Sequence, residues 1–310
     1  MADAPRLREM TPADRDMVAA LIRESTNRWY VAAGRSAIFQ GDPDATAVFF
    51  DVYHDLPGSG GLVAEIDAPP GVIGSCFYHV RPTHVSLGIM NVHPDHFGRG
   101  VAARLLDAIV ARADAQRKPL RLVSSAMNLD SYSLYTRRGF VPRAVYQDMV
   151  LPVPAGGLGA RPPLLDRVRP ATPADVARIA DLEESIAHIR RDTDYGYFIE
   201  NRQGFWHVSV IEDSGGALAG MMASSAHPAC NMVGPGAART EAHGLALLVA
   251  ELDRHRGRSP VFLVPAAHDR LVQSMYALGA RNCELHFSQV RGRWLGLDGL
   301  LFPTFLPESA

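Results

Sequence analysis

The sequence predicts a mixed α/β (α+β) protein built from two related halves. Strand-like apolar runs alternate with amphipathic helical stretches along most of the chain. A segment dense in proline and glycine, residues 152–163, interrupts these patterns near the middle. After it the chain begins again in the same way, because Thr-Pro-Ala-Asp occurs at 11–14 and returns at 172–175.

The first half opens with a short predicted strand, residues 6–9. Thr11 then reads as a helix N-cap followed by proline at the first helical position. The predicted helix loosens after Ser25 into a region of loops and a short helix, residues 25–61, that is rich in aromatic side chains. These aromatics either cap the edge of the core or line a substrate pocket.

Three strands are predicted next, followed by a turn and a helix. The strands cover residues 61–66, 71–80 and 83–92, and the helix covers about 101–113. The turn contains Gly98-Arg99-Gly100. Glycines at the start of a helix let backbone N–H groups approach an anion, and the helix N-terminus adds partial positive charge. This turn is therefore interpreted as a pyrophosphate cradle.

The rest of the first half contains a short buried strand at 120–124, a helix at 130–138 that ends at Gly139, and a strand at 141–151. Together with the linker, this gives predicted domains at 1–152 and 166–310, joined by residues 153–165. The second domain echoes the first at several points in the same order, which favours an internal duplication.

Composition excludes several classes of protein. The formal charge of −2 provides no global field for nucleic acid or an anionic membrane. The N-terminus lacks a signal-peptide pattern, and no apolar run approaches the roughly 18 residues that a membrane span needs. The three cysteines are widely separated, with no metal-ligand spacing. We therefore expect a cytoplasmic protein with no metal, no nucleic-acid partner and no membrane contact.

Two motifs in the first half resemble the GNAT N-acetyltransferase superfamily. The first is Val92-His93-Pro94, followed by Gly100-Val101-Ala102 in the Gly-x-Gly/Ala places of that family. The second is residues 128–140, which match Asn-x-x-Ser/Ala-x-x-x-Tyr-x-x-x-Gly-Phe at every marked position. The resemblance covers roughly residues 5–152, and the whole chain is similar to tandem-domain members such as mycothiol synthase.

This resemblance implies two tandem GNAT folds, each a mixed, mostly antiparallel central sheet flanked by helices. It also implies acetyl-CoA as co-substrate. The residues that would bind it are Met90, Asn91 and Val92 at the strand end, Gly98, Arg99, Gly100, Val101, Ala102 and Ala103 in the cradle, and Asn128 and Ser131 beside the pantetheine arm. Phe97 departs from the family, which usually has Gln or Arg there, but this position can contribute through its backbone N–H, so Phe need not abolish binding.

Tyr135 matches the family tyrosine that protonates the departing CoA thiolate, and a phenol with an ordinary pKa of about 10 is protonated at neutral pH. The alternative role for Tyr135 is packing against the core. The general base is not readable: His79, His84, Asp51, Glu24 or a water chain are all open, and His93 reads as a turn residue. Cys76 lies on a predicted strand far from the motifs along the chain, so a covalent cysteine intermediate is not expected.

The second half is expected not to bind acetyl-CoA. Aligned through Val-x-Pro, Glu241 replaces Gly100 and would repel a pyrophosphate. Asn128 falls opposite Asp269, and one residue is lost before Gly279-Ala280, so that Tyr276 is expected in the core. The alternative is that Gly234, Gly236 and Gly244 form a different cradle.

The sequence therefore predicts an acyltransferase that uses acetyl-CoA to acetylate the amine of a small molecule by direct attack. A non-catalytic acyl-CoA-binding or sensor protein is the alternative from another class, and transfer of a longer acyl group or transfer to a hydroxyl is a narrower one. A homodimer is compatible with the sequence.

Overall fold

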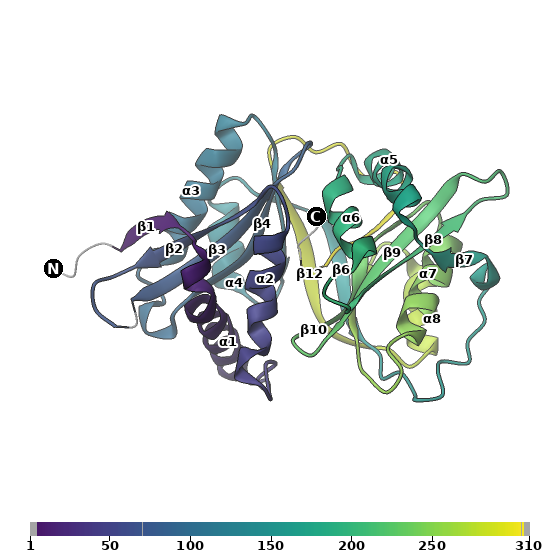
Figure 1. The fold of residues 1–310 in the computed structure, drawn as a ribbon, viewed down its shortest axis with the longest axis horizontal. Coiled ribbons are helices and arrows are strands. Elements are labelled where there is room, and N and C mark those ends of the chain that lie inside the picture. Colours follow the sequence, from purple (N-terminus) through teal and green to yellow (C-terminus); the bar gives the residue numbers. More distant parts are fainter. Residues whose placement is uncertain (1–4, 70, 305, 307–310) are drawn as a thin grey trace. The chain divides into compact units, whose positions relative to one another are not determined.

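The computed structural model describes residues 5–69, 71–304 and 306. They fall into two compact units: the first contains the described residues up to Leu120 together with Leu306, and the second contains Arg121–Thr304. Each unit is a sheet with helices packed on it (Figure 1). No helix among the described residues is both long and apolar enough to cross a membrane.

The first unit has four antiparallel strands in the order β1-β2-β3-β4. Its strands are β1 (Arg6–Glu9), β2 (Ser59–Glu65), β3 (Val72–Val80) and β4 (Val85–Val92), and its helices are α1 (Arg15–Ala32), α2 (Ala47–Asp55) and α3 (Val101–Ala115). The predicted strands and the predicted helix at 101–113 are thus confirmed to within a few residues. The expected loosening after Ser25 is wrong, because α1 continues to Ala32.

Helices cover both faces of this sheet. Gly74 and Tyr78 point to one face of β3, where a Cβ added at Gly74 would lie 2.7 Å from Val101 of α3, and where Arg112 of α3 lies over the Tyr78 ring. Phe77 alternates to the other face, where it stacks on Tyr53 of α2 at 4.3 Å. Gly74 therefore has a packing role, because it lets α3 approach the sheet closely.

The second unit holds residues 121–304. Its strands are β5 (Leu120–Ser125), β6 (Val141–Val150), β7 (Val168–Pro170), β8 (Trp206–Glu212), β9 (Leu218–His227), β10 (Cys230–Ala238), β11 (Val261–Pro265), β12 (Arg281–Arg291) and β13 (Leu300–Phe302), of which only the first residue of β5 belongs to the first unit. Its helices are α4 (Leu129–Thr136), α5 (Val176–Ala187), α6 (Asp192–Glu200), α7 (Glu241–Asp253) and α8 (Asp269–Ala277). The strand order is β5-β12-β6-β11-β10-β9-β8-β7, with β13 on β10.

The last strands of the two sequence repeats are exchanged in this sheet. By position in the repeat, β11 corresponds to β5 and β12 to β6, yet β12 lies next to β5 and β6 lies next to β11. The exchange is symmetric in its hydrogen bonds: Ala126 N–H donates to the carbonyl of Leu285, and Ala266 N–H donates to that of Val145. Strand β6 therefore bonds to strands of the other repeat, β11 and β12.

Because of this exchange, the compact units differ from the predicted domains 1–152 and 166–310. Those domains follow the sequence repeat and stay a prediction. The repeat itself is visible in the matching order of elements, with β1-α1-α2-β2-β3-β4-α3-β5-α4-β6 followed by β7-α5-α6-β8-β9-β10-α7-β11-α8-β12.

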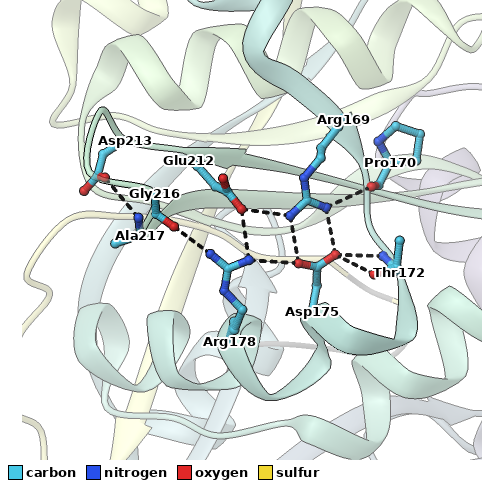
Figure 2. A network of polar contacts seen from close by, with 9 residues as sticks. All are labelled: Arg169, Pro170, Thr172, Asp175, Arg178, Glu212, Asp213, Gly216 and Ala217. Atoms are coloured by element: carbon cyan, nitrogen blue, oxygen red, sulfur yellow. Dashed lines mark hydrogen bonds and ion pairs between the residues drawn. The ribbon is translucent and has the colours of Figure 1, made fainter.

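The two repeats share the same network of polar side chains where each one begins. In the second repeat, Arg169 donates two hydrogen bonds to Asp175 and one to Glu212 (Figure 2). Asp175 also accepts from the backbone and hydroxyl of Thr172. The first repeat has the same network with Arg8, Asp14, Glu65 and Thr11 in these places. In each repeat the Thr-Pro-Ala-Asp motif thus caps the first helix, and its aspartate forms an ion pair with the arginine of the first strand.

We expect Asp14→Asn to destabilise the protein at pH 7 by about 2 kcal/mol, because a buried carboxylate loses charge-assisted hydrogen bonds. These bonds, chiefly those from Arg8, lower the pKa of Asp14 to about 2. A lowered pKa stabilises the fold above the unfolded value near 4, and this contribution is lost as pH falls from about 4 to about 2. Urea unfolding between pH 2 and 7 measures it.

The matched control for this prediction is Asp16→Asn, which removes an exposed carboxylate that pairs with Arg15. We expect it to change stability by less than about 0.5 kcal/mol. Equal effects of the two substitutions would contradict the structural role of Asp14.

Candidate active site

The predicted cradle is an exposed loop at the start of a helix. Gly98 and Gly100 have φ values of +73° and +80°, a left-handed backbone that favours glycine. A Cβ added at either would meet no protein atom within 4 Å. Gly100 is the N-cap of α3 and provides no side-chain cap, so the N–H groups of Val101, Ala102 and Ala103 in the first turn have no intrahelical partner. This loop presents a row of amides to an anion.

Strand β4 reaches this loop through an irregular segment. Its register with β3 shifts between the pairs Cys76–Met90 and Tyr78–Leu87, which places a β-bulge at Gly88 and Ile89. The Tyr53 hydroxyl accepts a hydrogen bond from Ile89 N–H at 3.4 Å. Sequence reasoning missed this bulge, for which Gly88 within a strand pattern was the available signal.

Met90, Asn91 and Val92 are the last three residues of β4, as predicted. The Asn91 side chain donates to Thr26 of α1 at 3.3 Å, so the side chain of Asn91 is directed to that helix. His93 begins the turn, and its Nδ1 accepts from Asp95 N–H at 3.3 Å. His93 is therefore a turn residue, as expected.

Phe97 lies in the turn between β4 and the glycines of the loop. Its backbone N–H donates to the carbonyl of Pro94 at 3.2 Å, so this amide is engaged within the turn, while its ring is 47% exposed. Arg99 is exposed in the same loop. Arg99 N–H also donates within the turn, to the carbonyl of His96 at 3.4 Å, so the amides that the loop offers are those of Gly98 and Gly100 and of the first turn of α3.

The second motif forms its own local structure in the second unit. Asn128 is the N-cap of α4, and its side-chain oxygen accepts from Ser131 N–H at 3.0 Å. Tyr135 lies in the last turn of α4, where it is 7% exposed and its ring lies 5.8 Å from that of Phe140. Helix α4 runs from Leu129 to Thr136, slightly displaced from the predicted 130–138.

The candidate bases are scattered. His79 is buried, with Nδ1 2.6 Å from the Ser59 hydroxyl, and its ring stacks on Tyr53. His84 is fully buried. Asp51 accepts two hydrogen bonds from Arg15. Glu24 lies 3.6 Å from His93. The base therefore stays open among them.

Cys76 is nearer to the first motif than its place in the sequence suggested, because it is paired with Met90 across β3 and β4. Its side chain is nevertheless fully buried. A nucleophile must reach its substrate, so this burial is consistent with the expectation that no cysteine intermediate forms.

The second repeat lacks the cradle because it lacks the loop. Val92 pairs with Gly74, and in the same way Ala238 pairs with Gly220, so these two residues mark equivalent strand ends. Residues 93–100 separate Val92 from α3, but only Arg239 and Thr240 separate Ala238 from α7.

The predicted alignment through Val-x-Pro is therefore wrong. Gly234 and Pro235 lie in a bulge of β10 at the register of the Gly88 bulge. The N-cap of α7 is Thr240, which takes the place of Gly100, and its hydroxyl accepts from His243 N–H. Glu241 accepts from Leu271 N–H at 2.8 Å. The second helix is thus capped by its own side chain, which agrees with the expectation that this half does not bind acetyl-CoA.

The counterpart of Tyr135 is Met275 rather than Tyr276. Phe140 N–H donates to the carbonyl of Tyr135, and Ala280 N–H donates in the same way to Met275. No residue is lost between the repeats. Tyr276 is 41% exposed and donates to Gln147, so its expected place in the core is wrong. The second repeat therefore has no hydroxyl at the position of the predicted acid.

Comparison with known proteins agrees with this architecture. Residues 57–142 match the family described as "Acetyltransferase (GNAT) domain". No functionally curated protein matches the sequence. Among solved structures, a provisionally named acetyltransferase of Pyrococcus horikoshii is similar at a TM-score of 0.75 and 13% identity, over 99% of this chain and 97% of that one.

Two further structures resemble nearly the whole chain. A GCN5-related N-acetyltransferase of Sphaerobacter thermophilus has a TM-score of 0.62 at 17% identity, covering 97% of this chain and 100% of its own. A tandem GNAT protein from the clavulanic acid biosynthesis pathway is similar at a TM-score of 0.59 and 16% sequence identity, over 92% of this chain and 98% of that one. At such identities these likenesses establish the fold. Residues 57–142 therefore match a GNAT acetyltransferase domain, and the chain as a whole shares its fold with tandem GNAT structures.

Proposed function

We propose that this protein transfers the acetyl group of acetyl-CoA to the amine of a small molecule by direct attack. The observation that carries the proposal is the contrast between the two repeats. The loop before α3 is glycine-rich, exposed and without a side-chain cap, whereas the equivalent helix α7 follows its strand almost directly and is capped by Thr240. A helix start without a side-chain cap, open to an anion, is thus present before α3 but not before α7.

The proposal assigns each part of acetyl-CoA to residues of the first repeat. The pyrophosphate accepts hydrogen bonds from the amides of Gly98 to Ala103, with Arg99 adding charge. The backbone of Met90 to Val92 pairs with the pantetheine amides and polarises the thioester carbonyl. Asn128 and Ser131 contact the pantetheine arm. These assignments follow the family resemblance, and no metal is required.

In the reaction, the amine nitrogen forms a bond to the thioester carbon, and the carbon–sulfur bond breaks. Backbone N–H groups stabilise the oxyanion, and Tyr135 gives its proton to the departing thiolate. The attacking nitrogen of the neutral amine then carries one proton more than the amide product, and this proton passes to the tyrosinate and regenerates the Tyr135 hydroxyl. The products are an amide and free CoA thiol. We also propose that the protein works in the reducing cytoplasm and forms a homodimer.

Calorimetry with acetyl-CoA and thiol release with a panel of primary amines test this function. We expect micromolar binding and amine-dependent release of CoA thiol, since micromolar to millimolar constants are usual for enzyme substrates. If calorimetry detects no binding of acetyl-CoA, the proposed function is wrong. Binding without thiol release for any amine would instead favour the acyl-CoA sensor, and release with hydroxyl acceptors or longer acyl-CoA would favour the narrower alternative.

A further inference from the structure

The second unit contains an open pocket at the point where β8 begins and where β9 and α7 end. The pocket has a volume of about 460 Å³ and is lined by residues 204–207, Ser224, Ala226 and residues 253–256. Small-molecule sites commonly have volumes of roughly 300–1,000 Å³. None of the lining residues belongs to the cradle or to the second motif, so the pocket is a candidate site of its own.

A buried glutamate orients a histidine of this pocket. Glu251 of α7 is fully buried, and its carboxylate accepts a hydrogen bond from the Ser224 hydroxyl at 2.6 Å. The other carboxylate oxygen lies 2.8 Å from Nδ1 of His207. Because an ionised carboxylate only accepts hydrogen bonds, Nδ1 carries the hydrogen of this contact. Glu251 therefore fixes the orientation of the His207 ring.

The second ring nitrogen of His207 is available to a ligand. The side chain is 21% exposed at the pocket, and Nε2 has no hydrogen-bond partner within the part of the chain that the structure describes. This atom accepts a hydrogen bond in the neutral ring and donates one in the protonated ring. An imidazolium here can donate to Glu251 through Nδ1 and to an anion in the pocket through Nε2.

The equivalent place in the first repeat is filled by an aromatic ring. His207 pairs with Ser224 across β8 and β9, and Gly60 pairs with Tyr78 across β2 and β3. The pairs correspond, because Gly60 and His207 each lie five residues before the glutamate that bonds the arginine of the first strand. A Cβ at Gly60 would collide with the Tyr78 ring, over which Arg112 lies. The second repeat thus has a polar pair beside a pocket where the first has a packed ring.

The lining of the pocket includes a positive charge without an acidic partner. Arg254, the C-cap of α7, is exposed and forms no ion pair with any residue that the structure describes. Arg256 is paired with Asp253. His255 adds no charge at pH 7, because burial lowers its pKa to about 4. Arg254 and Nε2 of His207 are therefore the groups of the lining that suit an anion.

Phe205 gives the pocket an apolar wall. Its ring is half-buried and lies 5.2 Å from the rings of both Trp206 and His227. Aromatic side chains provide a large apolar contact area and pack well against another ring in offset or edge-on geometry. A ligand that combines a ring with an anionic group therefore matches both parts of the lining.

We propose that this pocket binds a small aromatic carboxylate. The carboxylate of the ligand accepts hydrogen bonds from Arg254 and from Nε2 of His207, while the ring of the ligand packs beside Phe205. The pocket belongs to the repeat that lacks the cradle, so the inference goes beyond acetyl transfer and does not depend on it. The second repeat would then bind a ligand of its own.

Calorimetry with benzoate, on protein free of acetyl-CoA at pH 7, tests this site. Benzyl alcohol and benzylamine are the neutral and cationic ligands with the same ring. We expect benzoate to bind at least roughly tenfold more tightly than either, the effect of one charge-assisted hydrogen bond. In spectra of protein labelled with ¹⁵N-histidine, benzoate should shift the ring signal of His207, which is identified by its loss in His207→Gln.

Two variants and a control locate the binding. Arg254→Ala removes the unpaired guanidinium, and His207→Gln keeps a donor for Glu251 but has no second ring nitrogen. Each is expected to weaken benzoate binding about tenfold. Arg161→Ala removes an exposed arginine that pairs with Asp166, and it should leave the affinity unchanged. The charge preference of the wild-type protein needs no variant to fold.

An affinity for benzoate no higher than that for benzyl alcohol, or an unchanged affinity in both variants, would overturn the inference. Tighter binding of inorganic phosphate than of benzoate would also overturn it, in favour of a simple anion site that makes no use of Phe205. These measurements contain neither acetyl-CoA nor an acceptor amine. Their failure would therefore leave acetyl transfer intact, and a failure of acetyl transfer would leave this site intact.

Discussion

Replacing Gly100 with glutamate is expected to lower affinity for acetyl-CoA by roughly 100-fold, or about 2.7 kcal/mol. The substitution places a negative charge at the N-terminus of α3, where the pyrophosphate is proposed to bind, and its carboxylate takes up the helix N–H groups itself. A Cβ at this position meets no protein atom, so the fold loses only the roughly 1–2 kcal/mol of a left-handed residue. Calorimetry with acetyl-CoA measures the loss.

Two further substitutions at Gly100 separate the causes. Gly100→Ala adds the Cβ and the backbone strain without charge, and we expect about a tenfold loss. Gly100→Thr copies the cap that the second repeat has at Thr240, whose hydroxyl satisfies its own helix. We expect this variant to lie between alanine and glutamate.

Gly216→Glu is the matched control for strain and charge. Gly216 has φ +84° in the turn between β8 and β9, and a Cβ there also meets no atom within 4 Å. It lies in the repeat that lacks the cradle, so acetyl-CoA affinity should be unchanged. If Gly100→Glu bound acetyl-CoA as tightly as this control, the loop before α3 would not be the pyrophosphate site.

Local sequence signals predicted the elements well because each has a local physical cause. Thr11 and Asp14 form the cap that their spacing indicates, and Gly98 and Gly100 adopt the backbone that glycine favours. Asn128 caps α4 as the motif requires. In these cases the residues that determine the structure lie within a few positions of one another.

The prediction failed where partners are distant in sequence. Strands 141–150 and 281–291 each match a last strand of either repeat, so nothing local indicates that β6 pairs with β11 and β12. Asp148 and His286, for example, lie close together only because β6 and β12 pair, so the sequence could not predict that they are neighbours. Alignment of the repeats failed for a related reason: Val-x-Pro precedes a loop in the first repeat but lies in a strand bulge in the second.

The strand exchange also affects the structural role of the second repeat. The second repeat has Met275 at the place of Tyr135 and no loop before α7, so it lacks both predicted functional groups of the first. Its last strand nevertheless lies beside β5, which leads into the Asn128 motif. The second repeat therefore completes the sheet beside the Asn128 motif, although it lacks the groups assigned to donor binding.

Replacing Tyr135 with phenylalanine is expected to lower kcat by about 10²- to 10⁴-fold, the usual contribution of a positioned general acid. The side chain is 7% exposed and packs beside Phe140, so phenylalanine keeps the packing and removes only the hydroxyl. Affinity for acetyl-CoA should be little changed, because the acid acts on the departing thiolate. Steady-state thiol release with the best amine, together with calorimetry, measures both quantities.

Tyr276→Phe supplies the control for this acid. It removes a hydroxyl from the equivalent helix of the other repeat, where Tyr276 is exposed and bonds to Gln147. We expect kcat to stay within about twofold of wild type, since the residue in register with Tyr135 is Met275. Wild-type turnover in Tyr135→Phe would show that another group or water protonates the thiolate. Equal losses in both variants would indicate a structural effect of removing a tyrosine hydroxyl, because only Tyr135 is assigned to the reaction.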